Sequence, residues 1–404
     1  MKIFSCMLLI VGTTMFCSAQ KLVTTQQTNY LREGPASYFP IIEMLPNKTE
    51  VTKVDQTGSW LKVEVQQDLG WLSENSFVNR KGNEQRDLDM IKGRTSSRAS
   101  RAELAAAVKG FGQKYVEGSG ELNEDISKYS KPEVTPEEME KFEHSFTIEP
   151  FRGYMKVEKP FDIYFHEEGI GLGIAEKIAA QKGLVDDERA TRYINLIGNY
   201  LSQFTKAYDL GFRYYILNDN RASAFSCPGG YVFITKGILQ ICSNESELAG
   251  VIAHEMVHII QRHGLKELHL NEAKIKANKA FEELDEDTGG MTDEEKDLES
   301  YADNAYQNII SPRLLKYELE ADEIAMQYLY RAGYDPTSVV SVLEKIYQAP
   351  TAHPDIFDDN YMKTDDMQER LIKARSEVRD EGYRSDTKKH FDSRFDFYTK
   401  SIRQ

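Results

Sequence analysis

The sequence predicts an α+β protein with two folded units: a small N-terminal β-barrel or sandwich, and a larger, mainly helical unit with a small sheet. Short apolar alternations separated by turn residues fill the first unit, from Lys21 to about Arg80. Apolar residues then recur at helical spacing, and two apolar, β-branched runs, 212–217 and 231–235, predict neighbouring strands. A chain of 404 residues that is 40% hydrophobic can bury cores of this extent.

Residues 1–19 are typical of a signal peptide. Lys2 precedes an apolar stretch from Ile3 to Phe16, and Cys17-Ser18-Ala19 has small side chains at the spacing that signal peptidase recognises. We predict cleavage after Ala19 and export to the periplasm or the cell exterior. An uncleaved anchor is the alternative, whereas the bulky Phe16 disfavours lipid modification of Cys17. No later stretch approaches the roughly 20 apolar residues of a membrane span, so the mature chain is expected to have none.

Charge and cysteine content limit the classes of partner and of cross-link. The formal net charge of −15 arises from 50 basic and 65 acidic residues, which argues against nucleic acid as a partner. Cys6 and Cys17 would leave with the signal peptide. The sequence does not decide whether Cys227 and Cys242 form a disulfide or remain two buried thiols.

Residues 21–80 are expected to form the first domain. The segments Leu31–Pro35, Gly58–Val63 and Gly70–Leu72 resemble the bacterial SH3-like domain in order and spacing. The resemblance implies a small β-barrel that binds a cell-wall peptide or another protein segment. The alternative is a structural appendage without a ligand of its own.

Residues 81–150 are expected to be a helical connector. A polar run of small residues, Arg94–Arg101, precedes an alanine-rich helical stretch. A second helix is predicted to begin at Thr135, because Pro136 suits the first helical position and Glu138 completes a capping box. This segment carries no pattern of chemical groups that indicates a site.

The helix predicted to begin at Asn244 carries a His-Glu-x-x-His pattern. Asn244 and Glu247 form a capping pair, and Gly264 is a natural stop. His254 and His258 lie one turn apart on one face and can reach a single metal ion. Glu255 lies about 100° round the helix, where it can act on a water molecule at the metal. Buried core histidines with other partners are the weaker alternative, because unpaired imidazoles are costly among apolar residues.

Zinc in a catalytic site needs a third protein ligand and an open fourth position. The helical segment 316–329 offers Glu318 and Asp322, which share a face because they are four residues apart. Glu318 is predicted to bind the metal and Asp322 to accept a hydrogen bond from a ligand histidine. The alternative, a solvated acidic face, is disfavoured by Ala321 and the apolar run that follows.

Together, His254–His258 and Glu318–Asp322 resemble the metallopeptidase family that contains the CAAX prenyl protease, HtpX, Oma-type and BepA-type enzymes. Ala224-Phe225 and Pro228–Leu239 are similar to that family's Asn-Ala-Phe and Pro-Gly-Gly segments, and the similarity covers roughly residues 155–375. It implies a compact gluzincin domain, here bounded at 151–404, with Glu318 as third zinc ligand and Asp322 beside the ligands. Ser223 stands where the family usually has Asn, which puts one substrate contact in doubt.

A substrate-binding strand is also expected. A strand at a sheet edge can hold an extended peptide by main-chain pairing. The resemblance supports that use of four residues, Gly230, Tyr231, Val232 and Phe233. The alternative is a purely structural hairpin beneath the helix that carries the histidines.

His353 is the remaining candidate for chemistry. It precedes Pro354, and the family has a His-Pro followed by an arginine, a role that Arg370 could fill after an unusually long gap. The resemblance implies that His353 contacts the developing oxyanion; a turn histidine is the alternative. The other histidines show no ligand spacing and are expected to be structural or exposed: His144, His166, His263, His269 and His390.

These observations predict a zinc metalloendopeptidase of the cell envelope that holds one zinc ion per chain, with envelope protein quality control as an expected role. A chaperone-like or scaffold protein is one alternative. It is disfavoured because a purely structural zinc site has no use for Glu255 and usually has four protein ligands. A cell-wall peptide hydrolase is the other alternative, which differs in substrate.

Overall fold

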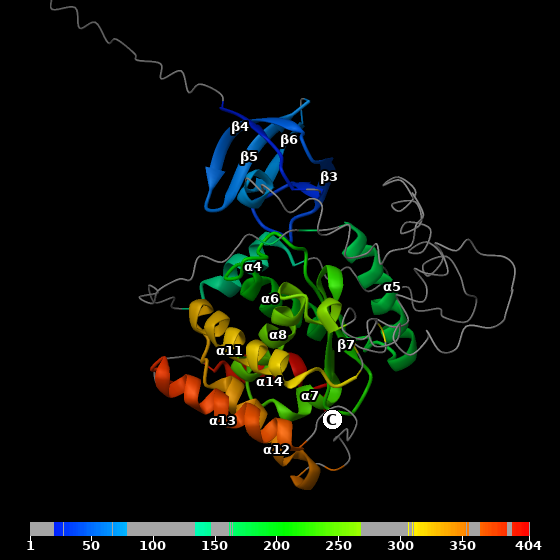
Figure 1. Ribbon diagram of the computed structural model, residues 1–404, viewed down its shortest axis with the longest axis vertical. Coiled ribbons are helices and arrows are strands. Elements are labelled where there is room, and N and C mark those ends of the chain that lie inside the picture. Colours follow the sequence, from blue (N-terminus) through cyan, green and yellow to red (C-terminus); the bar gives the residue numbers. More distant parts are fainter. Residues whose placement is uncertain are drawn as a thin grey trace, which may run out of the picture.

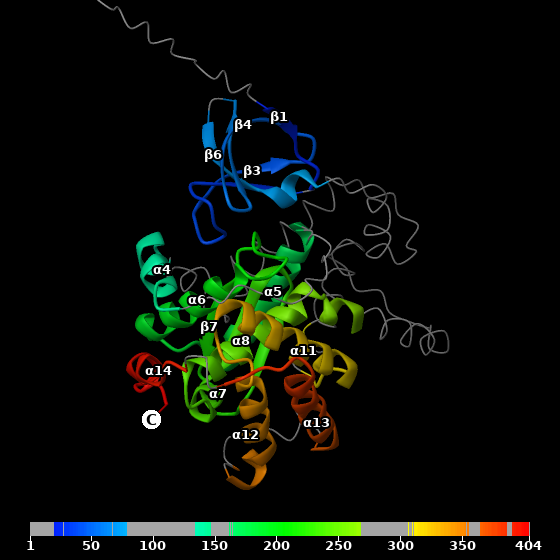
Figure 2. The same ribbon diagram turned by 90° about the vertical axis from the view of Figure 1, so that its left-hand side faces the viewer.

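The computed structural model describes residues 20–26, 28–66, 68–78, 134–146, 161, 163, 165–267, 306, 309, 311–352, 354, 364–385 and 390–403. The predicted signal peptide and most of the predicted connector lie outside these residues. A six-stranded sheet at one end of the molecule is followed by a mainly helical unit with a three-stranded sheet (Figures 1 and 2), so the predicted α+β class is confirmed. Among the described helices, none combines the length and apolar character that a membrane span requires.

The N-terminal unit is an antiparallel sheet with the strand order β1-β4-β5-β6-β2-β3. Its inward side chains, among them Leu31, Val63 and Leu72, are fully buried in a small core of their own. The alternation of buried and exposed residues along β5 follows the period of two expected for a strand with one buried face. The strands are β1 (Gln20–Val23), β2 (Thr28–Arg32), β3 (Ile41–Pro46), β4 (Glu50–Thr57), β5 (Trp60–Val65) and β6 (Asp68–Ser73).

This N-terminal unit packs on the helical unit through buried polar contacts. Asp209, in the loop 203–212, accepts a hydrogen bond of 2.6 Å from Ser73 Oγ and one of 3.2 Å from Asn75 Nδ2. Nearby, Tyr208 packs edge-on against Trp60 with the ring centroids 5.8 Å apart. Because Asp209 is fully enclosed between the two units, their contact is a specific interface rather than a loose tether.

The helical unit is built around one large core. In Figure 1, helix α8 lies near its centre, and α11 and α12 pack against α8. Helix α13 packs in turn on α11 and α12. The described helices are α4 (Pro136–Glu143), α5 (Phe165–Lys182), α6 (Glu188–Ser202), α7 (Lys236–Ile241), α8 (Glu245–Ile260), α11 (Leu315–Ala332), α12 (Ser338–Ala352), α13 (Thr364–Asp380) and α14 (Asp392–Thr399), with short 3-10 turns at η1 (Glu74–Phe77) and η2 (Pro228–Gly230).

Helix α4 begins as predicted. Thr135 is its N-cap, and Thr135 and Glu138 form a complete capping box with Pro136 in the first turn. Met139 and Phe142 are buried, and the Phe142 ring packs 5.6 Å from that of Tyr200 on α6. Residues 134–146, assigned to the connector by sequence, therefore contribute to the core of the helical unit.

The small sheet has the order β7-β9-β8, from β7 (Arg213–Leu217), β9 (Tyr231–Thr235) and β8 (Ala224–Cys227). The two predicted strands are thus confirmed as neighbours, and they pair in parallel. Cys227 at the end of β8 and Cys242 after α7 are both buried and free, so the two thiols are not linked.

Asn244 is the N-cap of helix α8, and its side chain accepts a hydrogen bond from the Glu247 main chain, as predicted. Its predicted end is wrong, because the helix stops at Ile260 and Gly264 lies in the helical turn that follows, 263–267. The break falls at Arg262, which adopts a left-handed φ of 53° without being a glycine.

Candidate metal centre

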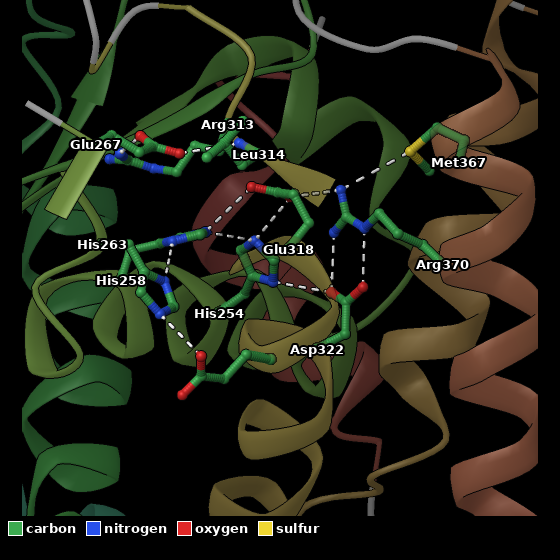
Figure 3. Close-up of polar contacts among 11 residues, drawn as sticks. His254, His258, His263, Glu267, Arg313, Leu314, Glu318, Asp322, Met367 and Arg370 are labelled. Atoms are coloured by element: carbon green, nitrogen blue, oxygen red, sulfur yellow. Dashed lines mark hydrogen bonds and ion pairs between the residues drawn. The ribbon is translucent and has the colours of Figure 1, made fainter. Parts of the chain in front are cut away.

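His254 and His258 lie on α8, and their side chains converge as predicted. The two Nε2 atoms are 3.0 Å apart, and the ring centroids are 4.7 Å apart. Residues four apart on a helix share a face, and this alone brings the two nitrogens together. Both imidazoles therefore present their Nε2 atoms to one point (Figure 3).

Glu318, in the first turn of α11, is the third side chain at this point. Its Oε2 lies 3.4 Å from His254 Nε2, and its Oε1 lies 3.3 Å from His258 Nε2. One turn further on, Asp322 accepts a hydrogen bond of 2.9 Å from His254 Nδ1. Figure 3 shows the two carboxylates of α11 on either side of His254. The packing of α11 on α8 brings together side chains that are 60 or more positions apart in the sequence.

The donor set fits a zinc ion. The ligand atoms of His254, His258 and Glu318 all lie within 4.8 Å of one another. Zinc bonds of about 2.0–2.1 Å place neighbouring tetrahedral ligands roughly 3.3 Å apart, close to the spacings found here. Two imidazole nitrogens and one carboxylate leave a fourth position open, which is the arrangement of a catalytic site rather than a closed structural one.

Burial and nearby charges shift the pKa values of these groups. Burial disfavours protonated His254, but its hydrogen bonds with Asp322 and Glu318 outweigh this and raise its pKa to about 10. Burial lowers the pKa of His258. Burial alone would raise the pKa of Glu318, but the Arg370 guanidinium and the two histidines hold it well below the usual value. Glu318 is therefore an anion, which suits a ligand of a divalent cation.

Arg370 on α13 joins the two carboxylates of α11. Its Nε and Nη2 donate to the two oxygens of Asp322, both at 2.8 Å, and its Nη1 lies 2.6 Å from Glu318 Oε2. This bidentate geometry holds both carboxylates in place and balances their charge in a buried position. The arginine that the sequence suggested as a partner of His353 thus stabilises the carboxylates beside the histidines.

Two sequence families match the chain. Residues 188–371, which include every residue of this group, match peptidase family M48. Residues 28–79 match the bacterial SH3 domain. The chain therefore has a region that matches M48 peptidases, preceded by one that matches bacterial SH3 domains; these two regions are called the M48 domain and the SH3 domain below. Peptidases of family M48 depend on zinc in general, in agreement with the donor set found here.

Similar proteins share this M48 region. The beta-barrel assembly-enhancing protease of Yersinia pestis is 30% identical over 186 residues, which cover 45% of this chain and 37% of that protein. The protease of the same name in Escherichia coli K12 is 28% identical over 169 residues, 40% of this chain and 34% of that protein. The mitochondrial metalloendopeptidase OMA1 of Schizosaccharomyces pombe is 28% identical over 156 residues, 39% of this chain and 44% of that protein. The matched region thus spans less than half the length of each relative.

Glu255 follows His254 on α8 and is almost fully buried. It lines two adjoining cavities together with Ala224 and Glu318. The carboxylate predicted to be the base therefore lies next to the candidate metal-binding group of His254, His258 and Glu318, at the point where the two cavities meet. A water molecule that enters either cavity can reach it.

The order of strands in the small sheet contradicts the prediction that an edge strand at 230–233 pairs with the substrate. Tyr231, Val232 and Phe233 belong to β9, the central strand, which pairs with β7 on one side and β8 on the other. Gly230 precedes them in η2. Because both edges of β9 are already paired, its main chain cannot also pair with an extended peptide. Next to this sheet, Ser223 is buried, and its main chain bonds to the Thr235 side chain.

His263 is a member of the site that the sequence prediction missed. It is fully buried, and its Nδ1 lies 2.9 Å from Nδ1 of His258. Its ring stacks on Tyr317 with centroids 4.4 Å apart, and its Nε2 lies 3.4 Å from a carboxylate oxygen of Glu320. The missed signal was the position of a third histidine five residues after His258, just beyond the end of the helix.

The other histidines lie apart from this group or outside the described residues. His353 and His269 are outside them, as is the side chain of His166. His144 is exposed at the end of α4, and His390 Nε2 lies 3.4 Å from Asp335. The oxyanion role of His353 therefore remains a prediction.

Proposed function

We propose that this protein is a zinc-dependent endopeptidase with one zinc ion per chain, held by His254, His258 and Glu318. The observation that carries the proposal is that these three side chains converge beside Glu255 where two cavities meet. The match to peptidase family M48 and the protease names of the relatives support it. The scaffold alternative is disfavoured, because Glu255 has no role in a purely structural zinc site.

Peptide-bond hydrolysis follows from the chemistry of this site. Zinc, when bound, supplies Lewis-acid polarisation of the scissile carbonyl and of the attacking water. Glu255 accepts the proton of that water as general base and then delivers it to the nitrogen of the leaving amine. Asp322 and Arg370 keep His254 and Glu318 in place during both steps.

His353 is proposed, from family resemblance, to donate a hydrogen bond to the oxyanion of the tetrahedral intermediate. Such a role predicts that His353→Ala lowers kcat while the bound zinc stays at one per chain.

We further propose that the protein is exported and acts on envelope proteins. The signal-like residues 1–19 support export, and relatives named for β-barrel assembly support a role in envelope protein quality control. The N-terminal sequence of the protein recovered from the cell envelope tests this, and Gln20 is the expected first residue. The ligand of the SH3 domain is proposed to be a cell-wall peptide or a protein segment.

The first experiment compares casein hydrolysis by residues 20–404 with that by the Glu255→Gln variant at equal zinc content. The parent is expected to cleave casein, and the variant to lose nearly all activity while it keeps its zinc, because Gln cannot accept the proton. Equal activity of the two proteins would remove Glu255 from the mechanism.

Two further results would favour the alternatives. A zinc-loaded parent that suppresses aggregation of casein without cleaving it would indicate a chaperone-like protein. Release of peptides from purified peptidoglycan, with casein untouched, would indicate a cell-wall peptide hydrolase.

A further inference from the structure

The first turn of α5 carries two adjacent carboxylates that contact different parts of the molecule. On one side, the Tyr30 hydroxyl of β2, in the SH3 domain, donates a hydrogen bond to Glu168. On the other, Glu167 accepts a hydrogen bond of 2.6 Å from Nε of Arg262, two residues past the end of α8. Neighbouring residues of one helical turn therefore join the SH3 domain to the segment that ends α8.

The position of this turn depends on contacts with other elements. The first main-chain N–H groups of a helix have no acceptor within the helix, and helix ends fray. The short turn η2 packs closely here, since a Cβ at Gly229 would lie 2.6 Å from Glu168 Cα. Burial raises the pKa of Glu168, and the Tyr30 hydroxyl and two arginines, Arg213 and Arg32, oppose this rise. The turn is thus held by the SH3 domain and by η2 together.

Arg262 in turn determines where His263 lies. Its φ of 53° is a left-handed conformation that few side chains adopt, and it changes the direction of the chain after α8. Two side-chain contacts hold it, the ion pair with Glu167 and a stacking contact in which the guanidinium lies 4.6 Å from the ring centroid of Phe161. The next residue, His263, has its Nδ1 2.9 Å from Nδ1 of His258 (Figure 3). Arg262 therefore places the ring that faces a candidate metal ligand.

Glu167, Arg262 and His258 also line one cavity. Its empty volume is about 380 Å3, and Ser226 and Pro228 form part of its wall. Close-packed side chains would keep the neighbouring groups in place, whereas a cavity leaves them room to move. The ion pair between Glu167 and Arg262 is therefore needed to keep this segment in one position beside His258.

We propose that Tyr30, Glu167 and Arg262 are positioning residues for the candidate metal ligand His258, so that the SH3 domain controls how tightly the M48 domain holds zinc. The inference rests on the proposed function and adds its control by a second domain. The series of contacts runs from Tyr30 through the first turn of α5 to Arg262, His263 and the His258 ring. Loss of one contact lets that ring turn away from the direction in which its Nε2 binds metal.

The zinc affinity of the protein, measured by competition with a chelator, tests the proposal. Arg262→Asn removes the ion pair but keeps a residue type that tolerates the left-handed φ, and it is expected to weaken zinc binding about 10-fold. Tyr30→Phe removes one hydroxyl and is expected to weaken zinc binding about 2–5-fold. Because both substitutions act on one series of contacts, the double variant should bind zinc no more weakly than Arg262→Asn alone.

Two matched controls remove the same kinds of group elsewhere. Tyr208→Phe removes a hydroxyl that contacts Ser59 and Ser73 at the other contact between the SH3 domain and the helical unit. Arg192→Gln removes an arginine whose Nε pairs with Glu138 at 2.9 Å between α6 and α4. Both controls should leave the zinc affinity unchanged, whatever they do to the urea unfolding of the zinc-free protein.

Unchanged zinc affinity in folded Tyr30→Phe and Arg262→Asn proteins would overturn the proposal. An equal loss of affinity in Tyr208→Phe and Tyr30→Phe, or additive losses in the double variant, would do the same, because the two sites would then act independently of this series of contacts. Casein cleavage separates this failure from failure of the enzyme. If the parent cleaves casein and the variants bind zinc as it does, the peptidase stands without the positioning role. If the affinities fall as expected but casein is not cleaved, the positioning role stands and the endopeptidase proposal fails.

Discussion

At the scale of single residues, each of the two candidate histidine ligands is oriented by a partner of its Nδ1 atom. His254 donates from Nδ1 to Asp322, and His258 faces His263 in the same way. Burial lowers the pKa of His263 to about 2, so this ring is neutral near pH 7. We assign the shared proton to Nδ1 of His258. His263 then carries its own proton on Nε2, which lies 3.4 Å from a carboxylate oxygen of Glu320, and Nε2 of His258 is free to bind metal.

This chain of contacts predicts that His263 is a positioning residue for the metal. His263→Ala is expected to weaken zinc binding about 10–100-fold, because the His258 ring loses the group that fixes its orientation. Competition with a zinc chelator measures the affinity. The conservative His263→Gln, which keeps a hydrogen-bond acceptor, should recover part of the loss.

His144→Ala, at an exposed position directly after α4, is the control for the loss of an imidazole. Unaltered zinc affinity in a folded His263→Ala protein would mean that His263 only fills space between α8 and Tyr317.

At the scale of elements, α8 is fixed at its first residue. Glu245 is completely buried there and accepts hydrogen bonds from the hydroxyls of Tyr193 and Tyr334, at 2.6 and 2.7 Å. Arg394 of α14 forms a bidentate ion pair with the same carboxylate. Its guanidinium lies against Phe391, 4.0 Å from the ring centroid, and Phe142 lies 4.4 Å away. The C-terminal helix therefore holds the start of the helix that carries the histidines.

Arg394→Met should destabilise the protein by about 3–5 kcal/mol, because it leaves the carboxylate of Glu245 buried without its cation. Urea unfolding of the zinc-free protein measures this. Lys141→Met, which removes an exposed ion pair with Glu137 on α4, is the matched control and should leave the unfolding midpoint unchanged. A similar midpoint for Arg394→Met and the parent would show that the tyrosine hydroxyls satisfy Glu245 by themselves.

At the scale of the whole molecule, the SH3 domain is joined to the helical unit at two points. Asp209 bonds to Ser73 and Asn75, and the Tyr30 hydroxyl donates to Glu168 on α5. Helix α5 also reaches the end of α8, because Glu167 pairs with Arg262 at 2.6 Å. The SH3 domain thus contacts a helix that itself supports the helix with the histidines, in keeping with a structural role beside any ligand binding.

The interface predicts a pH effect at Asp209. Burial raises the pKa of this carboxyl, so the folded protein holds the proton more tightly than the unfolded chain does. The contribution of Asp209 to stability is then lost as pH rises above the ordinary Asp pKa of about 3.9. The Asp209→Asn variant has no ionisable group at this position and does not undergo this loss of stability. Its free energy of unfolding relative to that of the parent should therefore increase as pH rises from 4 to 8. Urea unfolding across this range measures the difference; a constant difference would show that Asp209 is charged in both states.

The sequence by itself determined those features that depend on a single helix or a single turn. The helical period places His254 beside His258 and Glu318 beside Asp322, and the capping residues at Thr135 and Asn244 act within one turn. Tertiary structure alone decided that β9 is the central strand, that His263 reaches His258 past the end of the helix, and that Arg370 joins both carboxylates. It also decided that the N-terminal domain is bound to the helical unit through Asp209. These contacts join residues that are far apart in the sequence, so no helical or strand period predicts them. They depend on how whole elements pack, because a buried polar group is stable only where it has hydrogen-bond partners, and here those partners come from other elements.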